Sequence, residues 1–143
     1  MAGTETGPLA GPREAFELHR ARLLAEKDTG VDYVAMLAED VIGEVPFARP
    51  GEQRRFEGRA QFGGWASALS GRVRFTDVRD VVVHETADPE VAVVEYTVEG
   101  VREADGVKAA VPFVLVVRVS DGRVVLWREY QDPGAMALLA GDV

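Results

Sequence analysis

The stretch 121–133, DGRVVLWREYQDP, holds the residues best placed for chemistry. Asp-Gly at its start is a tight-turn signal, and Asp-Pro at its end stops a strand. Side chains alternate along a strand, so Glu129 shares one face with Trp127 and Gln131, while Arg128 lies on the other. Burial of either face therefore buries a charged residue, Glu129 or Arg128. A buried charged group must be paired, have a shifted pKa or serve a function. Two interpretations of Glu129 follow: a structural hydrogen-bonded acid, or a general acid or base whose pKa is raised by apolar neighbours.

The composition bounds the class of protein. The chain has 143 residues, of which 47% are hydrophobic, and this predicts one soluble globular domain. A net charge of −8 argues against a nucleic-acid-binding surface. The absence of cysteine excludes disulfides, thiolate metal sites and a cysteine nucleophile. His19 and His84 show no metal-ligand spacing, so we expect neither a metal nor another cofactor.

The N-terminal stretch lacks the basic and apolar regions of a signal peptide, and no apolar run reaches the ~18 residues of a membrane span. We therefore expect a cytoplasmic protein that does not bind membranes.

The order of periodic segments predicts the fold. Residues 1–12 have no periodicity and are expected to form a loose leader before a single domain over 13–143. Helical spacing, β-rich runs and turn signals then divide the domain. The predicted elements are helices over 13–30, 31–38 and 59–69, a strand over 41–47, a polar loop over 48–58, strands over 73–86, 91–103, 107–119 and 123–132, and a brief C-terminal helix that ends at Gly141.

This order predicts an α+β fold in which a cone-shaped, curved, mostly antiparallel sheet packs against three N-terminal helices. The short Asp105-Gly106 and Asp121-Gly122 breaks favour antiparallel pairing of the late strands as a meander. The interior of such a cone is apolar and suits a hydrophobic small molecule.

Three motifs carry a resemblance to a known family. They are LAEDVIGEVPFARPG, the EGR before the third predicted helix, and DGRVVLWREYQDP. Together they resemble the SnoaL-like branch of the nuclear transport factor 2-like superfamily, over roughly residues 13–140. The resemblance implies the cone fold, but it leaves the chemistry open because this fold hosts unrelated functions.

The family's catalytic positions are only partly retained. Limonene-epoxide hydrolase, a relative, has Trp-Arg-Asp-Tyr where this chain has Trp-Arg-Glu-Tyr, so its water-activating aspartate falls on Glu129. The polyketide cyclase of the branch places its catalytic aspartate there too. The hydrolase's arginine and aspartate fall on Tyr96 and Val98, and its tyrosine and asparagine fall on Gly43 and Val45. One carboxyl group is thus kept, and the epoxide-opening set is not.

Ketosteroid isomerase, a further relative, fits less well. Its base falls on Val45, its oxyanion-hole acid on Leu115 and its oxyanion-hole tyrosine near Ala21. The resemblance therefore points to no complete catalytic set of the family.

Strand alternation and the helical stripes define the expected pocket. We expect Glu129 to move a proton and Tyr96 to orient a substrate carbonyl, although Tyr96 is also a plausible core aromatic. His19 is a candidate ligand contact at the pocket rim. The remaining expected ligand-binding residues are Val45, Phe47, Phe62, Trp65, Val98, Phe113, Leu115, Trp127 and Gln131.

Two functional classes stay open. The first is a cofactor-independent enzyme of isomerase, cyclase or hydrolase type, and the second is a non-catalytic ligand-binding or dimerisation module of the same fold. We also expect a homodimer, because Val91, Val93 and Thr97 share the outer face of their strand with two glutamates. On that face we expect Arg128 to pair with Glu95 or Glu99.

Overall fold

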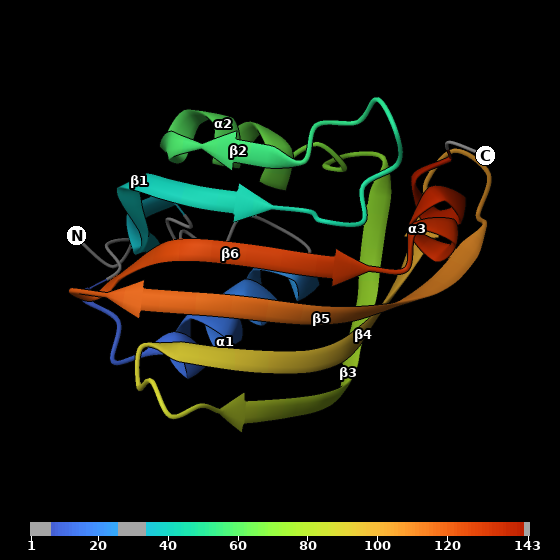
Figure 1. Cartoon of the computed structure of the whole chain (residues 1–143). Coiled ribbons are helices and arrows are strands. Elements are labelled where there is room, and N and C mark those ends of the chain that lie inside the picture. The colour runs from blue at the N-terminus through green and yellow to red at the C-terminus, as the bar shows by residue number, and fades with distance from the viewer. Residues whose placement is uncertain (1–6, 26–33, 142–143) are drawn as a thin grey trace, which may run out of the picture.

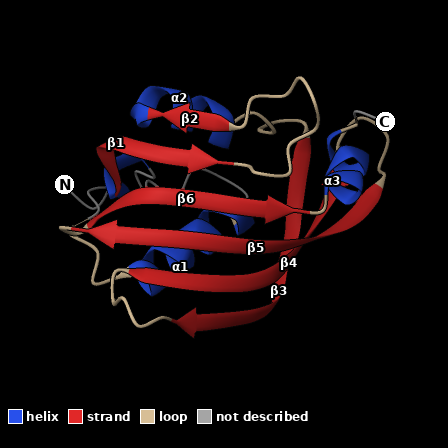
Figure 2. Cartoon of the chain, viewed as in Figure 1, coloured by secondary structure: helices blue, strands red, loops and turns tan. Residues whose placement is uncertain are grey.

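A computed structural model describes residues 7–25 and 34–141. The described chain forms three α-helices, a short 3₁₀ turn and six strands (Figure 1; Figure 2). In order these are α1 (Pro12–Leu24), η1 (Val34–Met36), β1 (Leu37–Glu44), β2 (Arg55–Glu57), α2 (Gly58–Ala66), β3 (Val73–Glu85), β4 (Val91–Arg102), β5 (Lys108–Ser120), β6 (Arg123–Gln131) and α3 (Pro133–Ala140).

The six strands form one curved, unclosed sheet in the order β2-β1-β6-β5-β4-β3. All neighbours pair antiparallel except β1 and β6, which are parallel. Asp121 and Gly122 both have positive φ, 51° and 74°, as a tight hairpin between β5 and β6 requires. The predicted α+β cone with a mostly antiparallel sheet is confirmed.

The helices enclose the concave face of the sheet. Helix α1 crosses β3, β4 and β5, α2 packs on β1 and β2, and α3 closes the end of the cone near β4 and β5 (Figure 1). Gly43 permits the close approach of α2, because a Cβ there would lie 2.9 Å from Cδ2 of Phe62. The largest fully buried side chains include Trp127, Phe16 and Phe62, so the core lies between the helices and the sheet.

Several predicted elements need correction. The predicted polar loop 48–58 contains β2, which pairs with β1 as a short, arginine-bearing edge strand that has no clear sequence pattern. The predicted helix 31–38 lies partly outside the described residues, and its described part is a 3₁₀ turn followed by the start of β1. Helix α1 ends at Leu24, and α3 is C-terminal, so the helices are not all N-terminal.

The predicted leader lies only partly within the described residues, since 1–6 fall outside them. That expectation included Leu9, which is held against the rest of the domain. That residue is buried, and its backbone N–H donates to the carbonyl of Gly122 at 2.9 Å.

Inward alternation follows the prediction on β4 and β5, where Ala92 to Val98 and Val111 to Val117 are buried at every second position. On β6, the pairing passes from Arg118–Leu126 to Val119–Val124, so Val125 is an extra, bulged residue. Val124 is therefore buried instead of Val125, and the inward face resumes at Trp127.

Within the part of the chain that the structure describes, no helix is long and apolar enough to cross a bilayer.

Candidate functional site

The cone encloses a cavity of about 1150 Å³. Helix α1, the end of α2 and the turn after it, strands β3 to β6, and helix α3 all contribute to its wall. Pockets that hold drug-sized molecules usually measure ~300–1,000 Å³. The space is therefore sufficient for a molecule of two or more rings.

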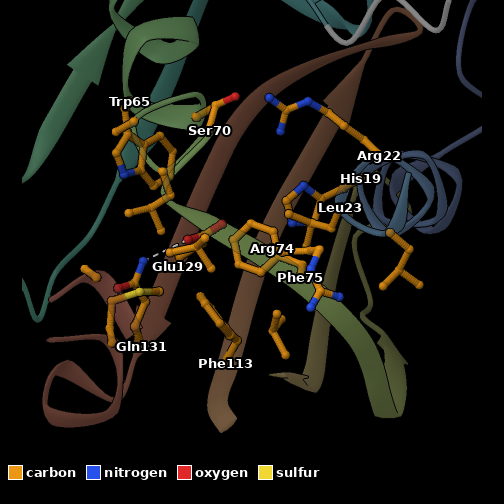
Figure 3. Close-up of a pocket in the computed structure, with 18 of the residues that line it drawn as sticks. His19, Arg22, Leu23, Trp65, Ser70, Arg74, Phe75, Phe113, Glu129 and Gln131 are labelled. Atoms are coloured by element: carbon orange, nitrogen blue, oxygen red, sulfur yellow. Dashed lines mark hydrogen bonds between the residues drawn. The ribbon is translucent and has the colours of Figure 1, made fainter. Parts of the chain in front are cut away.

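Glu129 lies in the wall of this cavity and is only 8% exposed. The indole Nε1–H of Trp127 donates to Oε1 of Glu129 at 2.8 Å. Nε2 of Gln131 donates to Oε2 of Glu129 at 3.0 Å (Figure 3). The three side chains stand at alternate positions of β6, which is why they share one face. Among the described residues, the hydrogen-bond partners of Glu129 are these two uncharged donors.

Burial raises the pKa of Glu129, while the hydrogen bonds from Trp127 and Gln131 act in the opposite direction. Desolvation is the larger effect, because the free-energy cost of removing a carboxylate from water exceeds the stabilisation that two neutral hydrogen-bond donors provide. Within the described residues, no arginine forms an ion pair with Glu129. An acid held in this way can give a proton to a bound molecule or take one from it.

His19 faces the same cavity from α1 (Figure 3). Its ring packs edge-on against Trp127, with 4.7 Å between the ring centroids. Burial, with a smaller contribution from the nearby Arg22 guanidinium, lowers the pKa of His19 to about 3. His19 is therefore a neutral imidazole near pH 7, and such a ring carries one donor nitrogen and one acceptor nitrogen.

The structure brings most of the predicted site residues to one cavity. Tyr96 is 3% exposed and stacks on Phe113 with 5.1 Å between ring centroids, so its phenol forms part of the wall. The predicted residues that line the cavity are His19, Trp65, Tyr96, Val98, Phe113, Trp127, Glu129 and Gln131.

Four predicted residues lie elsewhere. Phe62 and Leu115 are fully buried in the core behind the wall. Val45 and Phe47 line a second hollow of about 270 Å³. Phe47 was expected to face inward, but it is 59% exposed because β1 ends at Glu44 and the chain turns at Pro46.

Other cavity residues were not singled out from the sequence. Arg22, three positions after His19, was detectable from helical spacing alone. The other lining residues come from the ends of α1 and α2, from turns and strand ends, and from α3, whose positions depend on the tertiary fold. Those with polar side chains are Ser70, Arg74, Thr76 and Glu103.

The outer face of β6 differs from the prediction. Nε of Arg128 donates to Oε1 of Glu44 at 2.9 Å, and not to a glutamate of β4. The reason is the strand order, because β6 lies between β1 and β5 and β4 is one strand further away. Arg128 is thereby held on the outer face, away from Glu129.

The described residues include no group of three or more histidine, cysteine or acidic side chains that could hold a metal ion.

Comparison with known proteins agrees with this architecture. Residues 14–127 match the SnoaL-like domain family. The chain belongs to the SnoaL-like family. It is 35% identical over 120 residues to an uncharacterised PhzA/B-like protein from Pseudomonas aeruginosa, and the match covers 81% of each chain.

Two solved structures superpose well on this chain. A candidate isomerase from Bacillus subtilis gives a TM-score of 0.81 at 21% identity, covering 92% of this chain and 93% of the other. A candidate polyketide cyclase from Pseudomonas putida gives 0.72 at 23% identity, covering 93% and 98%. At these identities the similarity supports the nuclear transport factor 2-like fold, and not a particular reaction.

Proposed function

We propose that this SnoaL-like protein binds a hydrophobic small molecule in the main cavity and moves a proton on it with Glu129. The observation that carries the proposal is a buried carboxyl group that accepts hydrogen bonds from two neutral donors and lies in the wall of a cavity of about 1150 Å³. Its raised pKa brings an acid closer to the pH at which it can both give and accept a proton.

The reaction class follows from the groups around the carboxyl. Tyr96 and neutral His19 lie in the same wall and suit a substrate carbonyl or hydroxyl. Proton transfer at a carbon next to a carbonyl, as in isomerisation or ring closure, needs one base and one hydrogen-bond donor to the oxygen. In this proposal Glu129 is the base, and Tyr96 or His19 is the donor.

The test uses 2-tetralone, an apolar bicyclic ketone, as a probe. We expect the protein to accelerate deuterium incorporation at the carbons next to the carbonyl in D₂O, measured by proton NMR. Glu129→Gln should lower this rate by roughly 10²–10⁴-fold, the usual effect of removing a positioned proton-transfer group. Glu17→Gln is the matched control, since Glu17 is exposed on α1 and lies outside the cavity.

A non-catalytic ligand-binding role is the second candidate. It is favoured by the hydrogen bonding of both Glu129 oxygens within the protein, as in a structural acid. Trp65 and Trp127 line the cavity, so binding of 2-tetralone should change tryptophan fluorescence. Binding that survives Glu129→Gln, with no exchange above the buffer rate in any variant, would support this role and contradict the proton-transfer proposal.

A further inference from the structure

The hydrogen bonds at Glu129 fit its ionised form. Both carboxyl oxygens accept, Oε1 from the Trp127 indole at 2.8 Å and Oε2 from the Gln131 amide at 3.0 Å. The indole N–H can only donate, whereas a glutamine side chain carries a donor at Nε2 and an acceptor at Oε1. The two partners therefore differ in what they can do when Glu129 gains a proton.

Protonation makes one carboxyl oxygen a donor. A proton on Oε1 of Glu129 finds no acceptor at the indole of Trp127, which continues to donate to that oxygen. A proton on Oε2 would point at the Nε2 donor of Gln131 unless the amide turned. Rotation by about 180° exchanges the nearly isosteric N and O ends of the amide, and then the carbonyl oxygen accepts from the acid.

The surroundings of Gln131 leave room for this rotation. The residue is half-buried at the last position of β6, and it lines both the main cavity and the second hollow of about 270 Å³. Solvent in the hollow can satisfy whichever end of the amide faces away from Glu129.

The other charged and titratable groups of the cavity wall come from several elements. They are His19 and Arg22 on α1, Arg74 on β3, Tyr96 on β4 and Glu103 immediately after β4; the described parts of α2, β5 and α3 in the wall supply none. None of them is a hydrogen-bond partner of Glu129 among the described residues.

We propose that the Gln131 amide rotates with the protonation of Glu129, donating to the carboxylate and accepting from the carboxylic acid, and so places the acid's proton on Oε2. Gln131 is then a positioning residue for the proton-transfer step, and the inference rests on the proposed function of Glu129. The proton that Glu129 takes from the bound molecule exchanges with solvent before a proton or deuteron is returned, so no further protein group has to accept it.

The direct test is an NMR titration of the wild-type protein without ligand. The ¹³Cδ signal of Glu129, assigned by its loss in Glu129→Gln, reports the carboxyl, and the ¹⁵N–¹H signals of the Gln131 side chain report the amide. We expect both to titrate with one midpoint, with the amide protons moving upfield as they leave the carboxylate. An amide signal that does not change through the Glu129 midpoint would overturn the inference.

Gln131→Met provides the second measurement, since it keeps side-chain length and removes both hydrogen-bonding roles. Loss of the donor to the carboxylate raises the Glu129 midpoint, and loss of the acceptor for the acid lowers it. Because the hydrogen bond to the charged form is the stronger, the net upward movement should stay below about one unit, a tenfold change in proton affinity. The pH profile of 2-tetralone exchange should move with it. A rise of about two units or more, the result for an amide that bonds only the carboxylate, would also contradict the inference. These NMR results do not depend on turnover, so they distinguish failure of the Gln131 inference from failure of the proposed function.

Discussion

His19 provides a prediction whose size follows from the structure. Burial lowers the pKa of His19 from 6.5 to about 3. Below pH 6.5, His19 therefore binds a proton in the unfolded chain and stays neutral in the folded protein. Folding stability is therefore fully present above pH 6.5 and falls as the pH is lowered towards 3. The slope is about 1.4 kcal/mol per pH unit for one proton.

The perturbation is His19→Asn, which keeps a neutral polar side chain and removes the titrating group. Between pH 7.5 and pH 5.0, His19 affects stability only below pH 6.5, which is a range of about 1.5 pH units. At about 1.4 kcal/mol per pH unit, His19 lowers the free energy of unfolding of the wild type by about 2 kcal/mol over this range. The variant should lose about 2 kcal/mol less than the wild type over this range. Its own pH-independent loss of packing against Trp127 cancels in the comparison.

Urea unfolding at the two pH values, followed by tryptophan fluorescence, measures the free energies. His84→Asn is the matched control, because it removes the other histidine of the chain from a half-exposed position on β3. Because His19 is unchanged in this variant, it should retain the decline that His19 causes. The contribution of Glu129 is common to all three proteins. Equal declines in the wild type and His19→Asn would refute the burial of His19 as a neutral ring.

The remaining predictions concern stability and assembly. Burial raises the pKa of Glu129, so the folded state loses stability as the pH rises above the pKa that Glu129 has in the unfolded chain. Glu129→Gln should therefore gain stability relative to the wild type from pH 5 to pH 8. A lower urea midpoint of the variant relative to the wild type over this range would contradict this. Gly43→Ala should cost about 1–3 kcal/mol because its Cβ would meet Phe62 at 2.9 Å, and unchanged thermal unfolding would exclude that clash. Asp132→Ala removes the cap whose Oδ1 accepts from two backbone N–H groups at 3.0 and 3.1 Å, and should cost about 1 kcal/mol in urea unfolding. We also propose a homodimer through the outer face of β4. Light scattering of the wild type should give a mass of twice 15.5 kDa, and Val93→Arg should reduce this mass. A wild-type mass of one chain would count against the dimer.

The late strands were predictable because their signals are local. Asp-Gly turns and period-two alternation depend on neighbours along the chain, and they placed β3 to β6 within a residue or two. The same alternation put Glu129 beside Trp127 and Gln131, since these residues lie on one strand. Family motifs then predicted the cone.

Elements whose identity depends on pairing across the chain were not predictable. Leu37 and Ala38 were predicted to end a helix, but they lie at the start of β1, where Leu37 pairs with Val124 of the parallel strand β6. Arg128 was matched to β4, although the strand order places Glu44 beside it. Local propensity is weak, and pairing energy in a sheet overrides it.

The chemistry of Glu129 was decided at both levels. The sequence alone showed that the carboxyl group of Glu129 lies on the same face of the strand as Trp127. Only the tertiary structure decided that this face is the inner one, that helix α1 brings His19 against Trp127, and that no described arginine reaches the carboxyl. Burial and pKa are properties of the surroundings in three dimensions, and those surroundings come from helices and strands distant in the chain.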